Sequence, residues 1–239
     1  MRLIVTRPEP DASATAALLR ARGHAVDVAP LLRVETLPTA DLGAGPWGGI
    51  VITSANAVRA IAGHAHKTEL LAELLARPLF AVGRRSAEAA RAAGFADVIS
   101  ADGDAADLAA LVAARADRKL PLLYLAGEDR AADLESALAA HGIALATVVV
   151  YRAVAEPGLP HPISAALAAD DIDGVLHYSR RSADVFVAAA LAARIDLNSL
   201  KTKHYCLSAE VAAALRQVGV AAVATAAQPD QAALIALIG

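Results

Sequence analysis

The chain repeats two kinds of α/β segment in the order A-B-A-B, and this repeat constrains its fold more than any single motif. Segment A, in residues 3–34 and 121–154, has an apolar strand, a turn, a helix closed by glycine and a second strand. Segment B, in residues 50–113 and 175–238, has a strand, a glycine-closed helix, a short strand and a final helix. A length of 239 residues allows one large or two small domains, and the repeat predicts two similar α/β domains.

The expected strands are short, apolar on both faces and separated by helices, which is typical of parallel sheets covered on both sides. One of them is expected to run from Val26 to Leu32. Helix N-caps are expected at Ser86, Asp104 and Asp230. Glycines that close helices are expected at Gly23, Gly94, Gly142 and Gly219. The predicted fold class is α/β, with each domain a parallel sheet flanked by helices.

Composition and charge exclude several classes of protein. The longest unbroken apolar run, Val185 to Ala193, has about half the length that a bilayer requires, so no membrane association is expected. Met1 leads directly into a strand, and Cys206 is the one cysteine, so we expect a cytoplasmic protein without disulfides. A net charge of −3, dispersed basic residues and 3% aromatic content argue against nucleic acid as the main partner.

Small polar residues and glycines gather where the predicted strands end. Ligands of doubly wound sheets bind at this edge, where helix N-termini and free backbone N–H groups favour anions. We therefore expect an acidic substrate of some size, bound by residues of both domains. The candidate binding residues are, in chain order, Arg7, Thr53, Ser54, Asn56, Gly83, Ser86, Gly127, Ser179 and Ser208.

Each of these residues also has a simpler explanation. Ser, Thr and Asn at strand ends are ordinary helix N-caps. The neighbouring pairs Arg84-Arg85 and Arg180-Arg181 are equally consistent with a solvated surface. The convergence of several such loops on one edge is what favours a binding site over capping alone.

Other kinds of site find little support in the sequence. Neither the G-x-G-x-x-G nor the G-x-x-x-x-G-K-[ST] fingerprint is present. His64 and His66 form a close pair without further plausible ligands, so a solvent-facing loop is favoured over a metal site. Cys206 lies in an apolar strand and is interpreted as a core residue rather than a nucleophile. We expect neither a metal nor an organic cofactor.

Tyr151 is the candidate catalytic residue. It follows the second strand of the second A segment and precedes a proline-rich stretch, residues 156–162. A phenol with a pKa of about 10 is protonated at neutral pH and can donate a proton to a leaving oxygen. The alternative is a tyrosine that packs at the end of a strand with its hydroxyl group in water.

Six short motifs follow one another along the chain. They are TRP at 6–8, ITSANAV at 52–58, AVG-x-x-SA at 81–87, LYLAGEDR at 123–130, VVVYR at 148–152 and PDQAAL at 229–234. Each motif is weak alone, but the ordered set is specific and resembles the uroporphyrinogen-III synthase family. The resemblance covers essentially the whole chain.

The resemblance implies a crossed domain arrangement. Residues 1–34 and 155–239 would form one domain, and residues 37–150 would form the other. Two extended runs, Leu32 to Thr36 and Val149 to Val154, would pair as an antiparallel, two-stranded β linker between the domains. The repeat alone would instead divide the chain near Leu120.

The resemblance also implies a reaction. Hydroxymethylbilane, a linear tetrapyrrole with acetate and propionate groups, loses its terminal hydroxyl group to give an azafulvene. Rearrangement through a spiro intermediate inverts the last ring, and closure gives uroporphyrinogen III for haem, sirohaem or cobalamin biosynthesis. The family uses no metal and no organic cofactor. The chain is expected to act as a monomer, and the preceding pathway enzyme is a possible direct donor of the substrate.

The family's functional residues fall on particular positions of this chain. Its tyrosine falls on Tyr151, its Thr-Ser turn on Thr53-Ser54, its hydroxyl residue after AVG on Ser86, and its serine at a strand end on Ser179. The chain departs from the family pattern at residues 208–211, SAEV, where a glycine with nearby threonines is usual. A function of another class, a two-domain binding or sensor protein for an anionic metabolite, is the alternative.

Overall fold

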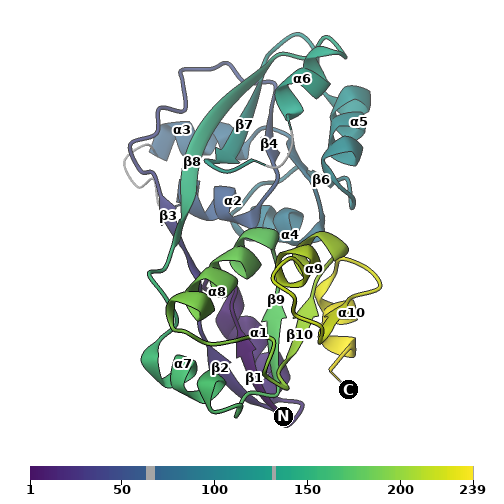
Figure 1. Ribbon diagram of the computed structural model, residues 1–239. Coiled ribbons are helices and arrows are strands. Elements are labelled where there is room, and N and C mark those ends of the chain that lie inside the picture. Colours follow the sequence, from purple (N-terminus) through teal and green to yellow (C-terminus); the bar gives the residue numbers. More distant parts are fainter. Residues whose placement is uncertain (63–67, 131–132, 239) are drawn as a thin grey trace. The chain divides into compact units, whose positions relative to one another are not determined.

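A computed structural model describes residues 1–62, 68–130 and 133–238 (Figure 1). The chain divides into two compact units. Unit 1 combines Met1–Arg33 with Val154–Gly239, and unit 2 is Val34–Ala153. Both chain ends therefore belong to unit 1, and the middle of the chain forms unit 2. None of the helices in the described ranges is both long and apolar enough to cross a membrane.

Unit 1 contains a five-stranded sheet in the order β11-β10-β9-β1-β2, and all four pairings are parallel. Its strands are β1 (Arg2–Val5), β2 (Ala25–Val28), β9 (Gly174–His177), β10 (Lys203–Cys206) and β11 (Val223–Thr225). The N-terminal strand β1 is internal, because Leu3 is paired with Val26 of β2 on one side and with Gly174 of β9 on the other. The sheet of unit 1 thus needs both ends of the chain.

Helices cover both faces of this sheet, as expected for buried parallel strands. The helices of unit 1 are α1 (Asp11–Arg20), α7 (His161–Ala168), α8 (Arg180–Ala192), α9 (Ala209–Arg216) and α10 (Gln231–Ala236). Apolar side chains of α7, α8 and α9 form one core with Ile4 and Val175. Those of α1 and α10 form the other core with Leu3 and Leu176. Neighbouring residues of β1 and β9 thus point to opposite faces.

Unit 2 contains a six-stranded sheet in the order β3-β8-β7-β4-β5-β6. Its strands are β3 (Leu32–Thr36), β4 (Gly49–Ile52), β5 (Leu79–Ala81), β6 (Val98–Ser100), β7 (Leu122–Gly127) and β8 (Leu145–Ala155). Strands β4 to β8 pair in parallel. Strand β3 adds to β8 in the opposite direction, because Leu37 donates to the carbonyl of Val150 while Glu156 donates to that of Leu31. Unit 2 therefore has a mixed sheet, in which the parallel strands β4 to β8 carry one antiparallel strand, β3.

The helices of unit 2 also lie on both faces of its sheet. They are α2 (Ala55–Ala62), α3 (Thr68–Leu75), α4 (Arg84–Ala92), α5 (Ala105–Arg115) and α6 (Leu134–Ala139). Residues of α2, α3 and α4 form a core with Ile52 and Leu125. Residues of α5 and α6 form a second core with Val51 and Tyr124. The carboxyl ends of β4, β5 and β7 consequently lie between two layers of helices.

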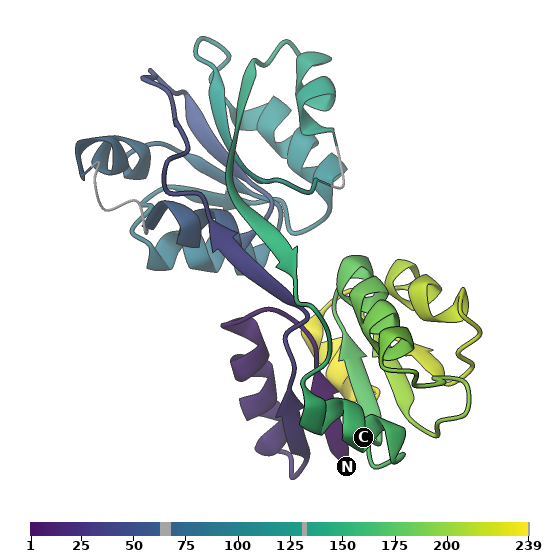
Figure 2. The ribbon, with the colours of Figure 1, turned by 60° about the vertical axis from the view of Figure 1, so that its left-hand side comes forward.

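The chain passes from one unit to the other within β3 and within β8, which lie side by side in Figure 2. Charged side chains accompany this pairing. Arg152 Nη2 lies 2.8 Å from Glu35 Oε2, and Arg33 Nε lies 3.5 Å from Glu156 Oε1. Both ion pairs are largely exposed, so each contributes at most about 1 kcal/mol. Backbone hydrogen bonds also join the two strands, as between Leu37 and Val150.

Local sequence signals explain most helix ends. Gly23, Gly94, Gly142 and Gly219 all have positive φ, as predicted for closing glycines. Asp104 caps α5, accepting hydrogen bonds from the N–H groups of Ala106 and Asp107, and the capping box with Asp107 is complete. Asp230 caps α10 in the same way, through the N–H of Ala233.

Two sequence predictions in these regions are wrong. Ser86 does not cap α4, because that helix begins at Arg84 after Gly83, and Ser86 lies buried inside its first turn. The strand expected from Val26 to Leu32 is divided into β2 and β3. Pro30 lies in the break, and proline cannot donate a hydrogen bond to a neighbouring strand.

Candidate functional site

The carboxyl edge of the unit 2 sheet brings together several of the predicted residues. Adjacent strands β8, β7 and β4 contribute Tyr151, Gly127 and the Thr53-Ser54 turn to this edge. Gly127 is the last residue of β7 and is paired with Tyr151, at a point where the register shifts by one residue on β8. Such a bulge changes the direction in which a side chain points. At this bulge the ring of Tyr151 lies directly beside Gly127, at the end of β7.

Tyr151 is half-buried and held on two sides. Its carbonyl accepts a hydrogen bond from the N–H of Glu128 at 3.0 Å, and its ring packs against Gly127. Burial raises the pKa of Tyr151 above its ordinary value. A hydrogen bond with the Ser54 side chain opposes this rise, and the nearby Tyr124 hydroxyl adds to it. The phenol is therefore protonated at neutral pH, which is the state that a proton donor needs.

Thr53 and Ser54 follow β4 and make different contacts. Thr53 Oγ1 lies 2.9 Å from the hydroxyl oxygen of Tyr124, a buried residue of β7. Ser54 Oγ accepts a hydrogen bond from the N–H of Asn56 at 3.2 Å, near the start of α2. The same serine side chain also influences the pKa of the Tyr151 phenol.

Tyr124 is a residue that the sequence analysis did not select, although it lies within the LYLAGEDR motif. One signal was available. A tyrosine in the middle of an apolar strand must satisfy its hydroxyl group inside the protein. The two nearest hydroxyl residues on a neighbouring strand, Thr53 and Ser54, were already candidates.

Asn56, Gly83 and Ser86 lie around the same unit 2 edge. Asn56 Oδ1 accepts a hydrogen bond from Arg59 Nη1 at 2.8 Å. Gly83 precedes α4 with an extended backbone, and a Cβ atom there would have no neighbour within 4 Å among the described residues. The backbone at Gly83 is thus open to a ligand at the N-terminus of a helix. Ser86 is 6% exposed.

Arg7 follows β1 in unit 1 and is 6% exposed. Its Nη1 donates to Thr15 Oγ1 at 3.1 Å and to Gln231 Oε1 at 2.8 Å, and Nη2 lies 3.6 Å from Asp11 Oδ2. The guanidinium also lies 4.0 Å from the centre of the Tyr178 ring, within the range of a cation–π interaction. These contacts join α1 to α10.

Ser179 and Ser208 cap helices that follow the strands of unit 1. Ser179 Oγ accepts from the N–H of Ser182 at 3.1 Å, and Ser208 Oγ accepts from the N–H of Val211 at 3.3 Å. The capping explanation is therefore correct for both serines. Both remain half-buried at the carboxyl edge of their own sheet.

A buried polar cluster lies beneath the loop at Ser179. His177 Nε2 lies 3.0 Å from His204 Nδ1, the two rings stack, and Phe186 packs edge-on against both. Burial lowers the pKa of His177 well below its usual value and that of His204 to about 4. Burial also raises the pKa of the Cys206 thiol to about 12, so this cysteine is a core residue rather than a thiolate nucleophile.

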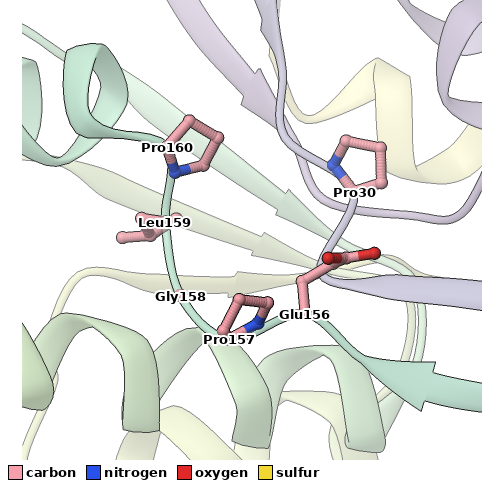
Figure 3. A pocket seen from close by; sticks show the side chains of 6 residues that line it. All are labelled: Pro30, Glu156, Pro157, Gly158, Leu159 and Pro160. Atoms are coloured by element: carbon pink, nitrogen blue, oxygen red, sulfur yellow. The ribbon is translucent and has the colours of Figure 1, made fainter.

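No metal site competes with the strand-end residues in the described part of the chain. Within the described ranges, no three His, Cys, Asp or Glu side chains are placed to hold a metal ion. The pair His64 and His66 lies outside those ranges. An open hollow in unit 1 (Figure 3) is lined by Pro30, Glu156, Pro157, Gly158, Leu159 and Pro160. Its one charged side chain, Glu156, is ion-paired with Arg33.

Comparison with known proteins identifies the family. The family model described as uroporphyrinogen-III synthase HemD matches residues 13–236. The chain belongs to the uroporphyrinogen-III synthase family. It is therefore a cyclising lyase of tetrapyrrole biosynthesis, and the resemblance inferred from the ordered motifs is confirmed.

Solved structures show the same fold. A uroporphyrinogen-III synthetase from Helicobacter pylori is 19% identical, with a TM-score of 0.70 over 100% of this chain and 98% of that one. A mutant uroporphyrinogen III synthase from Thermus thermophilus is 20% identical, with a TM-score of 0.58 over 100% and 96%. No curated protein matches the chain significantly. The likeness confirms the α/β fold class of this uroporphyrinogen-III synthase family member.

Proposed function

We propose that this chain cyclises hydroxymethylbilane to uroporphyrinogen III, with inversion of the last pyrrole ring and loss of water, and that Tyr151 assists the loss. The family match over residues 13–236 supports the reaction. The observation that carries the role of Tyr151 is the position of its ring beside Gly127, at the edge where the neighbouring strands β7 and β4 also end. Burial raises the pKa of this phenol and keeps it protonated at neutral pH. A protonated phenol in that position is suited to donate to a departing hydroxyl oxygen.

The remaining predicted residues are proposed to hold the acidic side chains of the substrate. Hydroxyl groups and backbone N–H groups at helix N-termini favour carboxylates. We assign this role in unit 2 to Thr53, Asn56, Gly83 and Ser86. In unit 1 we assign it to Ser179 and Ser208. Because many groups share the work, positioning a flexible chain in one geometry is the main catalytic effect.

Arg7 and Gly127 are proposed to contribute indirectly. The guanidinium of Arg7 donates hydrogen bonds to Thr15 of α1 and Gln231 of α10. Arg7 is therefore proposed to support the site by holding these two helices in place. Gly127 lies against the ring of Tyr151 and sets its position. Both residues thus support the candidate site from within their own units.

The test is Tyr151→Phe, assayed with hydroxymethylbilane followed by oxidation and separation of the type I and type III isomers. Spontaneous closure gives type I, so the isomer ratio separates catalysis from background. We expect turnover that is slower by about tenfold, at the low end of general-acid effects of about 10²–10⁴ or below it, with type III still formed. A shift to type I would make Tyr151 a positioning residue instead.

The matched control is Tyr205→Phe, which removes the hydroxyl of another buried tyrosine, in β10 of unit 1. It should keep both the rate and the isomer ratio. If Tyr151→Phe behaved like this control, Tyr151 would have no part in the reaction. If the unaltered protein released only type I, the chain would be a binding or sensor protein rather than a synthase.

The proposal also covers the oligomeric state, the cellular compartment, the domain division and the source of the substrate. We propose that the chain works as a monomer in the cytoplasm, with residues 1–34 plus 155–239 and residues 37–150 as its two domains. One buried cysteine and no disulfide among the described residues support a reducing compartment. The substrate must come from an enzyme that builds a linear tetrapyrrole, and direct transfer from it is testable by mixing the two proteins.

A further inference from the structure

The Thr53-Ser54 turn connects two tyrosines that belong to opposite faces of the unit 2 sheet. Tyr124 is part of the core under α5 and α6, whereas Tyr151 packs against the core under α2, α3 and α4. Successive residues of an extended chain point to opposite faces. Thr53 Oγ1 accordingly lies 2.9 Å from the hydroxyl oxygen of Tyr124. Ser54 is placed toward the other face, where the ring of Tyr151 lies against Gly127 of the intervening strand β7, and its side chain influences the pKa of that phenol. The turn thus connects a fixed tyrosine on one face with the candidate proton donor on the other.

The contact between Tyr124 and Thr53 is well placed to hold this turn. The two oxygens are 2.9 Å apart, and Tyr124 is 3% exposed in a strand whose residues are all buried. Strand β7 pairs with both β4 and β8, so its backbone is fixed on both sides. A hydrogen bond from so rigid a strand restrains the first residue after β4.

We propose that Tyr124 is a positioning residue for the reaction, which through Thr53 holds the hydroxyl of Ser54 against the phenol of Tyr151. This inference rests on the proposed role of Tyr151. Tyr124 itself is buried and need not touch the substrate. Its effect is to fix the geometry of the proton donor, and a small misplacement of such a group is costly to the rate.

The test uses two single variants and their combination. Tyr124→Phe removes the phenol oxygen and keeps the ring, and Thr53→Val removes the other partner with little change in volume. Each should lower kcat/KM by up to the roughly tenfold expected for Tyr151→Phe, with type III still formed, because both residues act through the proton donor. The double variant should be no worse than the worse single one, because both break the same contact. Additive losses would overturn the proposal.

A second readout does not depend on catalysis. The pKa of Tyr151 can be followed by NMR of ring-labelled tyrosine. The hydrogen bond from Ser54 lowers this pKa and the neighbouring Tyr124 raises it. Thr53→Val keeps the Tyr124 hydroxyl but breaks its contact with the turn. If that contact holds Ser54 in place, the pKa of Tyr151 rises in Thr53→Val. A fall or no change would mean that the turn is held without Tyr124, and the proposal would fail.

One control variant and two further measurements distinguish a failure of this proposal from a folding defect and from a failure of the proposed function. Tyr205→Phe should leave the Tyr151 pKa and the isomer ratio unchanged. If Tyr124→Phe failed to fold, shown by thermal unfolding, the pKa of Tyr151 in Thr53→Val would decide, because the rate of that variant also reflects the proposed contact of Thr53 with the substrate. If Tyr151→Phe had no effect on catalysis, the proposed function of Tyr151 would fail, while the NMR titration would still decide whether Tyr124 positions Ser54.

Discussion

The ring of Tyr151 lies so close to Gly127 that no side chain fits between them. A Cβ atom at position 127 would stand 2.6 Å from Cζ of the tyrosine and 2.8 Å from its hydroxyl oxygen. The φ angle of Gly127 lies outside the left-handed region, so its backbone conformation is open to other residues. Glycine is therefore required at 127 because the tyrosine ring leaves no space for a side chain, and not because of the backbone conformation.

Gly127→Ala should displace the ring of Tyr151 and lower kcat by about tenfold or more, since a shift of about 1 Å in a positioned group is costly. Overpacking should also lower the free energy of unfolding by about 1–3 kcal/mol. Rates and urea unfolding measure the two effects. Gly158→Ala is the control, because a Cβ atom there has no described neighbour within 4 Å. Equal rates for both variants would contradict the steric explanation.

Ser54→Ala should extend activity to higher pH. The donor function of Tyr151 is present when the phenol is protonated and is lost as pH rises through its pKa. The Ser54 hydrogen bond lowers that pKa, so removing it raises the pKa and moves the alkaline limb of kcat upward. Rates measured between about pH 8 and 11 test this.

The control for this change is Ser136→Ala, which removes an exposed serine hydroxyl bonded to Asp133 in the same unit. It should leave the alkaline limb in place. A limb that moved to lower pH in Ser54→Ala would show that Ser54 does not stabilise the ionised phenol.

Arg7→Met should destabilise the protein by about 3 kcal/mol, because it leaves the partly buried carboxylate of Asp11 and the side chains of Thr15 and Gln231 without their shared donor. Urea unfolding measures the loss. Arg22→Met, at an exposed position after α1, should change the free energy of unfolding by less than about 0.5 kcal/mol. A similar small change in Arg7→Met would remove Arg7 from the contacts that join α1 and α10.

Acid should destabilise the protein through His177 and His204. Burial lowers both pKa values, that of His204 to about 4, so below about pH 6.5 the unfolded chain binds protons that the folded chain does not bind. The free energy of unfolding is therefore unaffected by these histidines above about pH 6.5. Below that pH it falls by at most about 1.4 kcal/mol per pH unit for each histidine. Urea unfolding at several pH values between about 7 and 4.5 measures the slope.

The variant that tests this assignment is the double change His177→Leu and His204→Leu, which should flatten the slope. His161→Gln, a change at an exposed position in α7, should leave it unaltered. An unchanged slope in the double variant would assign the acid sensitivity to other groups.

Much of this fold follows from local signals in the sequence. Closing glycines such as Gly94 and Gly219 and caps such as Asp104 lie where the pattern places them, because these depend on a few neighbouring residues. The direction of β3 does not follow from such signals. It is set by hydrogen bonds between residues far apart, such as Leu37 and Val150, which no local periodicity encodes. The antiparallel pairing of these two runs was therefore expected only from the family resemblance and not from the local pattern.

The sequence allowed the types of residue at the candidate site to be predicted, but not which residues contact one another there. Strand-end hydroxyls such as Ser54 were selected because parallel strands bring their ends to one edge. The burial of Arg7 under Gln231 was not foreseeable, since the two residues lie at opposite ends of the chain. Tyr124 was missed because its partner, Thr53, is identified only once the register of β4 and β7 is known.

The internal position of β1 dictates an order of assembly during translation. A ribosome produces the strand from Arg2 to Val5 long before its neighbour β9, which begins only at Gly174. Unit 2 is complete in sequence at Ala153, so the middle of the chain is ready to fold while the first 33 residues still lack their partners. Chains released before the C-terminal strands are made would therefore carry one finished unit and an exposed, apolar N-terminal segment for chaperones and proteases to recognise.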